Sequence, residues 1–182
     1  MNFSNPLRFV FLVLVFLISL INVSCDKEDT PKSSLIIKDN LLYKRDSNVP
    51  FTGREKAIVQ DKIIDYEVKD GYKHGEFRIY NLDGTLEISG QLDSNRNIGK
   101  WQYFHPNGII ESEGNFDYDL PQGKWFWYYP DGKKKEEGTY EKGKRVGIWY
   151  QYDRDGKVNL EKNFDLEDSL NVPQNSLKKE SH

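Results

Sequence analysis

The side chains that most often carry catalysis are few in this chain of 182 residues. It contains one cysteine, Cys25, and three histidines, His74, His105 and His182. No two of the histidines have the spacing of metal ligands, and the cysteine is far from all three in the sequence. The glycines stand in turn-and-strand repeats, which does not match a strand-to-helix phosphate loop. These residues predict a protein that is not an enzyme and that uses no metal or cofactor.

The carboxylates do not form a catalytic constellation either. Neighbouring pairs such as Glu111 with Glu113 and Glu136 with Glu137 are typical of solvated strand and turn positions. We therefore expect all four side chains to face solvent.

Cys25 follows a segment that is typical of an export signal. Arg8 provides a short positive start, residues 9–21 are almost wholly apolar, and Ser24 is a small residue directly before the cysteine. The apolar run is shorter than the roughly 20 residues that a membrane-spanning helix needs. We expect residues 1–24 to be a signal peptide. Three outcomes are open: lipidation of the cysteine, ordinary secretory cleavage, or retention as an uncleaved anchor.

This segment resembles the signal of bacterial lipoproteins, although Asn22 stands where that signal usually has leucine. The resemblance implies that Cys25 becomes the lipidated first residue of the mature protein, held on the bilayer of the cell envelope. The polar residues 25–34 would then be a flexible tether. The outer membrane is favoured because residues 27–29, Lys-Glu-Asp, resemble a surface-sorting signal. Short acidic runs are also common in plain linkers, so the periplasmic and surface sides both stay open.

The strongest pattern is an internal repeat of 24 residues without insertion or deletion. Each unit has a glycine, a large ring two residues later, a second aromatic residue and a turn glycine. These four rows are Gly75, Gly99, Gly123 and Gly147; Phe77, Trp101, Trp125 and Trp149; Tyr80, Phe104, Tyr128 and Tyr152; and Gly84, Gly108, Gly132 and Gly156.

The turn chemistry predicts a β-hairpin in every unit. Each turn ends in Asp-Gly or Asn-Gly, as in His105-Pro106-Asn107-Gly108, and the chain is 14% aromatic. In the third unit we expect strands over residues 123–129 and 133–140, joined to the next unit by a connector over 141–146. The fold class is therefore all-β, an elongated single array of stacked antiparallel hairpins.

The repeats also divide the chain. Residues 74–165 hold four units, and residues 35–73 form a divergent N-terminal capping segment, as is usual at the end of a repeat array. Residues 166–182 are a polar tail without a hydrophobic period.

Strand geometry places the two aromatic rows on opposite faces of the sheet. The Phe77 to Trp149 row is expected to form the core face, with Gly90, Gly114 and Gly138 leaving room for its rings. The second strands are expected to add further apolar side chains to this face, namely Leu86, Ile110 and Val158 together with Leu92, Phe116, Tyr140 and Phe164.

The opposite face carries the candidate site. Positions 78, 102, 126 and 150 change from Arg to Gln to Phe to Tyr, so the fold does not fix them. We expect a protein partner to bind an aromatic patch in the last units. Its residues are Phe104, Phe126, Tyr128, Tyr150 and Tyr152. The alternative is that these rings form a ladder that only stabilises the sheet.

Charge excludes two other classes of partner. The net charge is −3 at pH 7, and the sequence lacks the clustered basic field that nucleic-acid binding needs. Association with an anionic lipid surface also fits poorly with the net negative charge.

With these residues in place, the unit Gly-Lys-Trp-x-x-Tyr/Phe-x-Pro-Asx-Gly followed by Glu-Gly-x-Phe/Tyr resembles the MORN repeat variant of YwqK-type antitoxin proteins. The resemblance covers about residues 40–165. It implies an antitoxin or immunity role in which the array masks a toxin by protein–protein contact. The export signal departs from that family picture, because an exported antitoxin meets its toxin only in the envelope.

A second function class stays open. The aromatic hairpins also resemble choline-binding repeats, whose rings enclose a small cation, and this would make the protein an envelope module for glycans or small ligands. Those repeats are shorter and begin with Gly-Trp, whereas these units begin with Gly-Lys-Trp.

Overall fold

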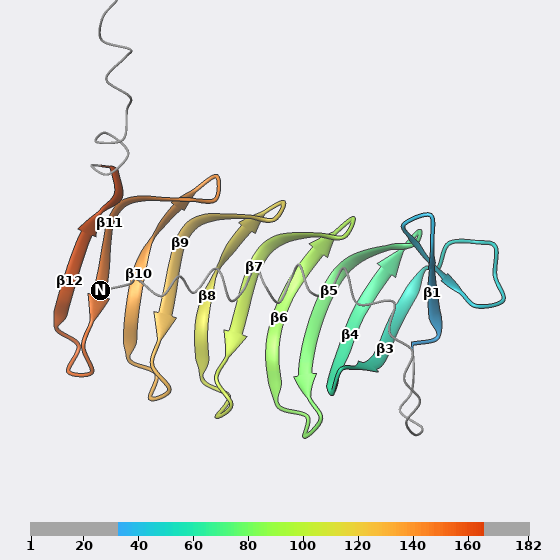
Figure 1. Ribbon diagram of the computed structural model, residues 1–182, viewed down its shortest axis with the longest axis horizontal. Coiled ribbons are helices and arrows are strands. Elements are labelled where there is room, and N and C mark those ends of the chain that lie inside the picture. Colours follow the sequence, from blue (N-terminus) through green and yellow to red (C-terminus); the bar gives the residue numbers. More distant parts are fainter. Residues whose placement is uncertain (1–32, 166–182) are drawn as a thin grey trace, which may run out of the picture. The chain divides into compact units, whose positions relative to one another are not determined.

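The computed structural model describes residues 33–165, and all twelve elements assigned there are β-strands. Strands β1 (Leu35–Lys38) and β2 (Leu41–Lys44) form a separate antiparallel pair. The other ten form one antiparallel sheet in which each strand pairs with its neighbours in sequence (Figure 1). They are β3 (Gly53–Val59), β4 (Lys62–Lys69), β5 (Tyr72–Asn81), β6 (Leu86–Asp93), β7 (Arg96–Phe104), β8 (Ile110–Asp117), β9 (Leu120–Tyr128), β10 (Lys134–Glu141), β11 (Lys144–Tyr152) and β12 (Val158–Asn163). The predicted all-β array of antiparallel hairpins is confirmed.

Three predicted segments fall outside this range: the signal peptide with Cys25, most of the tether, and the tail over 166–182. Within the described range no helix has the length and apolar character to cross a membrane.

The Asx-Gly turns close as the sequence predicts. The amide of Gly108 donates to the carbonyl of His105 at 2.8 Å, and Gly108 has a φ of 80°. The same hydrogen bond closes the turns at Gly84, Gly132 and Gly156. A glycine is needed there because other residues rarely adopt this left-handed conformation.

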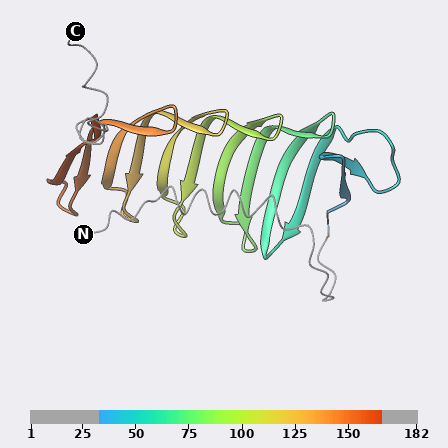
Figure 2. The same cartoon turned by 45° about the horizontal axis from the view of Figure 1, so that its top comes forward.

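The connector predicted over residues 141–146 is instead a tight turn between two strands. Lys142 and Gly143 both have positive φ, of 48° and 82°, and β11 begins directly after them. Ser94 with Asn95 makes the equivalent turn between β6 and β7. Two left-handed residues in succession match the twist of the flanking strands, so the chain forms a continuous meander with turns at both ends (Figure 2).

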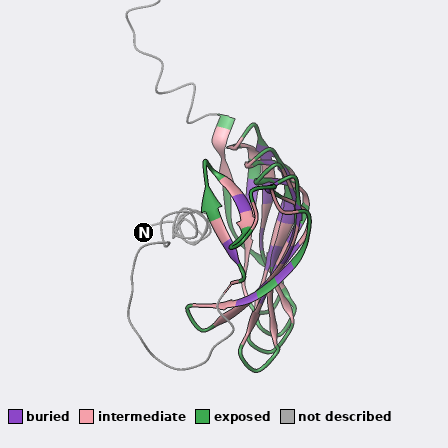
Figure 3. Cartoon of the chain, turned by 90° about the vertical axis from the view of Figure 1, so that its right-hand side faces the viewer, coloured by how far each residue is buried: buried purple, intermediate pink, exposed green. Residues whose placement is uncertain are grey.

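The core face is a row of large rings packed on glycines. Trp101 and Trp125 are each 1% exposed and Trp149 is 2% exposed. The nitrogen of each of these three indole rings donates to a backbone carbonyl at 3.2 to 3.3 Å, so burial leaves none of the three N–H groups unpaired. Buried segments run along the strands while the turns are exposed (Figure 3).

The rings touch edge to face along the sheet. Tyr140 lies between Trp125 and Trp149, with ring centroids 5.9 and 5.0 Å apart and interplanar angles of 78° and 87°. Phe116 fills the equivalent place between Trp101 and Trp125. Each unit therefore contacts the next through aromatic pairs.

The capping segment over residues 35–73 has two parts. Strands β3 and β4 extend the main sheet, whereas β1 and β2 stand apart from its ladder. Ser33 and Ser34 both bind the carboxylate of Glu55, which is 7% exposed. The predicted tether over 25–34 therefore has its last two residues docked on the folded domain.

Candidate functional site

The face opposite the tryptophans is here called the tyrosine face, defined by the row Tyr80, Phe104, Tyr128 and Tyr152. All four rings are half-buried, whereas the core-face side chains next to them, such as Tyr103 and Trp127, are buried. The alternation predicted from strand geometry is confirmed.

One expectation about the faces is wrong. Leu86, Ile110 and Val158 were expected on the core face, but the strand register pairs them with Tyr80, Phe104 and Tyr152 respectively. A register shift lies next to each pair, and one extra residue in a strand moves the following side chains to the other face. These apolar side chains therefore belong to the tyrosine face.

The five predicted partner-binding residues come from three strands. Phe104 lies on β7, Phe126 and Tyr128 on β9, and Tyr150 and Tyr152 on β11, and all five are half-buried. The intervening strands β8 and β10 bring a carboxylate between the rings. Glu113 pairs with Phe126 across β8 and β9, and Glu137 pairs with both Phe126 and Tyr150.

A hydrogen-bonded unit recurs on this face with the period of the repeat. The Tyr128 hydroxyl donates to Glu113 Oε1 at 3.3 Å. Lys100 lies 2.8 Å from Glu113 Oε2, and Gln102 donates to the same atom at 3.0 Å. Twenty-four residues later, the Tyr152 hydroxyl donates to Glu137 Oε1. Such cross-strand hydrogen bonds are what the ladder interpretation expects of Tyr128 and Tyr152.

Lys134 occupies a small cation site next to the Tyr152–Glu137 hydrogen bond. Its ammonium lies 2.9 Å from Glu137 Oε2, 5.4 Å from the centroid of the Phe126 ring and 5.6 Å from that of Tyr152. Two aromatic faces and one carboxylate are the groups that favour an ammonium ion.

The hydrogen bonds show in the pKa values. Partial burial would raise the pKa of the Glu137 carboxyl, but hydrogen bonds from Tyr152 and Lys134 outweigh it and lower this pKa. The pKa of Glu113 is lowered in the same way by Lys100, Gln102 and Tyr128. The hydrogen bond to Glu137 raises the pKa of Tyr152 to about 12. Both carboxylates are thus ionised at neutral pH, and each interacts with the hydroxyl and ammonium groups beside it on the tyrosine face.

Tyr150 differs from its two neighbours. Within residues 33–165 its hydroxyl has no hydrogen-bond partner, and Tyr150 lies opposite Glu137, whose other strand neighbour is Phe126. It is therefore available to a partner in a way that Tyr128 and Tyr152 are not.

Two further residues enlarge the site, and neither was predicted to belong to it. Ile148 is 41% exposed and lies two residues before Tyr150 on β11, and Val158 is 50% exposed on β12. The sequence held a signal for Ile148, because the three preceding units have charged residues at this position, Glu76, Lys100 and Lys124. We call the group Phe126, Ile148, Tyr150 and Val158 the apolar patch.

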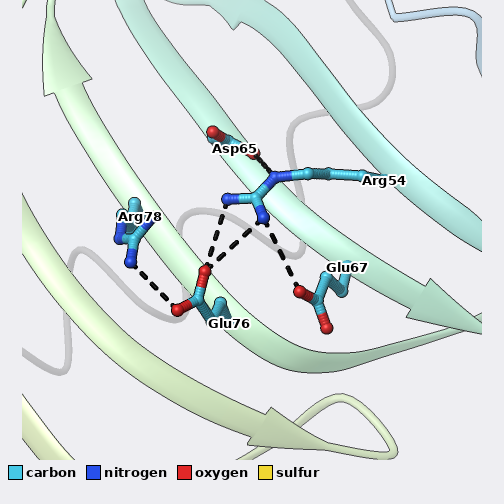
Figure 4. A network of polar contacts seen from close by, with 5 residues as sticks. All are labelled: Arg54, Asp65, Glu67, Glu76 and Arg78. Atoms are coloured by element: carbon cyan, nitrogen blue, oxygen red, sulfur yellow. Dashed lines mark hydrogen bonds and ion pairs between the residues drawn. The ribbon is translucent and has the colours of Figure 1, made fainter.

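The N-terminal half of the tyrosine face is charged instead (Figure 4). Arg54 lies 2.6 Å from Asp65 and 3.5 Å from Glu76, and Arg78 lies 3.0 Å from the other oxygen of Glu76. Arg78 occupies the repeat position of Phe126 and Tyr150. Along the sheet this repeat position thus changes from a charged side chain in an ion pair to an aromatic ring.

The core face contains one buried ion pair that the sequence pattern missed. Glu136, expected in solvent, is 7% exposed, and Oε1 of its carboxylate lies 3.4 Å from Arg145. Arg145 in turn lies 4.0 Å over the Trp149 ring. Burial raises the pKa of Glu136, and the charge of Arg145 opposes that shift. The other three carboxylates, Glu111, Glu113 and Glu137, are exposed or half-buried.

No metal-binding group of three or more His, Cys, Asp or Glu side chains occurs in the part of the chain that the structure describes. His105 makes a 2.9 Å hydrogen bond with the carbonyl of Tyr128, and His74 lies 3.2 Å from Asp93. Both histidines serve as local contacts between strands or turns.

Comparison with known families identifies the repeat. The family described as MORN repeat variant matches residues 98–118, 121–142 and 145–165. Each match covers one hairpin closed by an Asx-Gly turn, and the gaps between matches fall on or beside the two-residue turns. No curated protein matches the chain. Residues 98–165 of this chain are three MORN repeat variant units.

Proposed function

We propose that this chain is a non-enzymatic, membrane-anchored repeat protein that binds a protein partner through the apolar patch. The observation that carries this proposal is the patch itself. Phe126, Ile148 and Tyr150 replace charged or polar side chains of earlier units, and they lie on the same face of the sheet on β9 and β11, on either side of β10.

The surroundings of the patch favour a protein partner. Rings held by a rigid sheet lose little conformational entropy on binding, and tyrosine, phenylalanine and isoleucine together give a contact area with a polar rim. Glu137 lies between the strands of Phe126 and Tyr150 and is paired with Lys134, and the two side chains are 24% and 39% exposed. A partner that covers both rings would therefore also contact this ion pair.

The finer role that we propose is that of an antitoxin or immunity protein in the cell envelope. It rests on the resemblance to YwqK-type antitoxin proteins and on the lipoprotein-like signal ending at Cys25. Lipidation of Cys25 would hold the sheet at a membrane, with the outer membrane favoured, so its toxin would be met there.

One observation favours a second candidate, a module for a small cationic or glycan ligand. The Phe126 and Tyr152 rings with Glu137 already hold an ammonium ion, that of Lys134. A choline-like group would have to displace Lys134. Titration with choline, followed by Tyr fluorescence in the wild type and in Lys134→Ala, tests this candidate. Binding that tightens in Lys134→Ala supports it, and no binding in either protein rejects it.

Affinity capture from envelope extracts tests the main proposal. The full chain in detergent is compared with the double variant Phe126→Ser/Tyr150→Ser and with the control Tyr80→Ser, which lies on the same face outside the patch. We expect one protein to be retained by the wild type and by Tyr80→Ser and to be lost with the double variant. Equal retention by all three proteins would contradict the proposal.

A further inference from the structure

We infer that the partner adds an extended segment to the free edge of β12 and places a basic side chain beside Glu161. This inference rests on the proposed function and specifies how the partner binds. Within residues 33–165, β12 pairs only with β11, so its other side presents unpaired backbone N–H and C=O groups. Such an edge is a template for another strand.

The two edges of the sheet are not equivalent. At the β3 edge the Phe51 ring packs against Gly53, where an added Cβ would stand 2.9 Å from the ring, and Ser33 and Ser34 cover Glu55. At the β12 edge residues 158–161 are all exposed, with Leu160 at 40%. Of the two edges, the β12 edge is the one that adjoins the apolar patch.

The end of the array also limits what can pair with β12. Gly90, Gly114 and Gly138 each receive the tryptophan of the following strand, and the next residue in this row is Lys162. A side chain at that place prevents a ring from lying across the backbone. A further hairpin of the same kind, from this chain or from a second copy, cannot add in the register that joins β10 to β11.

The chemistry of β12 specifies the added strand. Glu161 lies opposite Tyr150, and Val158 opposite Tyr152, so both continue the tyrosine face. Glu161 is exposed and has no ion-pair partner within the described residues. A neighbouring strand would place an arginine or lysine beside this carboxylate and within reach of the Tyr150 ring, and an apolar side chain beside Val158. The segment that fits is extended, alternating and basic on one face.

A displayed library of linear peptides, each of roughly ten residues, tests the inference on the full chain in detergent. We expect selected peptides to alternate apolar and basic residues and to slow amide hydrogen exchange in β12. Affinity is expected to fall at least about tenfold in Leu160→Pro, which breaks the edge. The matched variant Lys56→Pro, on the β3 edge, is expected to bind like the wild type.

Because Leu160→Pro can also disturb folding, a second variant keeps the test decisive. Glu161→Lys is an exposed charge reversal, and with it the selection is expected to change from basic to acidic peptides. Peptides that bind equally to wild type, Leu160→Pro and Glu161→Lys, or a library that yields no binder, would overturn strand addition. If such peptides are nevertheless lost with Tyr150→Ser, the proposed function stands and only the inference fails.

Discussion

The indole ring of Trp149 lies so close across Gly138 that a Cβ added to the glycine would stand 2.0 Å from it. The same relationship joins Gly114 to Trp125 at 2.2 Å and Gly90 to Trp101 at 2.3 Å. The two residues of each pair come from adjacent strands of successive units. Because this contact recurs every 24 residues, the packing of the sheet has the same period as the sequence.

Gly138→Ala should destabilise the sheet because the new methyl group overlaps the Trp149 ring. We expect a loss of about 3 kcal/mol in the free energy of unfolding, at the upper end of the usual cost of overpacking. Gly138 does not need a left-handed backbone, so crowding is the only cause. Gly108→Ala is the control, since it has a φ of 80° and open space around it and should lose about 1 kcal/mol. A greater loss in the control, measured by urea denaturation, would contradict this packing account.

Trp125→Ala should be among the most damaging substitutions in the chain. The ring is 1% exposed and contacts Phe116, Trp127 and Tyr140, so its removal leaves a large cavity. We expect a loss of about 3–5 kcal/mol. Tyr150→Ala, on the tyrosine face, should cost about 1 kcal/mol or less. Thermal unfolding of both variants makes the comparison, and similar melting temperatures would show that the core face is assigned wrongly.

The Tyr152–Glu137 hydrogen bond should appear as a coupling between the two side chains. In a double-mutant cycle of Tyr152→Phe and Glu137→Gln we expect about 1 kcal/mol, below the range for a fully buried charged pair because both groups are partly exposed. Tyr150→Phe serves as the reference, because its hydroxyl has no partner within residues 33–165. A coupling near zero would mean that the ladder contributes nothing to stability.

Stability should decrease at both ends of the pH scale through this ladder. The pKa values of Glu113 and Glu137 are lowered in the folded protein. Their contribution is therefore complete above the ordinary pKa of 4.5 and is lost as the pH falls through the folded values. The raised pKa of Tyr152 acts in the opposite direction: its contribution is complete below pH 10 and is lost as the pH rises toward about 12.

The acid side can be measured by urea denaturation between neutral pH and pH 3. The double variant Glu113→Gln/Glu137→Gln should lose less stability over this interval than the wild type. An acid slope that is unchanged in the double variant would assign the pH dependence to other carboxylates.

Much of the fold could be predicted because one period fixes several contacts at once. The recurring positions of Trp125 and Gly114 predicted neighbouring strands, and the Asx-Gly turns predicted where the chain reverses between the two strands of each hairpin. The sequence could not show the two-residue turns, such as Tyr118-Asp119, because neither residue is a glycine although both have positive φ. It could not show the bulges either, and these moved Val158 to the tyrosine face.

The candidate site was predictable in part. Tyr150 was identified because its position varies among the units, and the same comparison at Ile148 would have found that residue. The hydrogen bonds that tie Tyr128 and Tyr152 into the ladder depend on which residues of adjacent strands lie opposite each other, and this register follows from the bulges. Burial of Glu136 depends on its ion pair with Arg145, and the repeat pattern does not predict that partner.

Photo-crosslinking in the native cell tests the central claim most directly. A photoreactive phenylalanine analogue replaces Tyr150 in one strain and Tyr80, at the charged end of the same face, in another. The proposed function predicts one crosslinked protein partner from position 150 and none from position 80. Equal crosslinking from both positions, or none from position 150 in a folded protein, would contradict the claim that the apolar patch is a protein-binding surface.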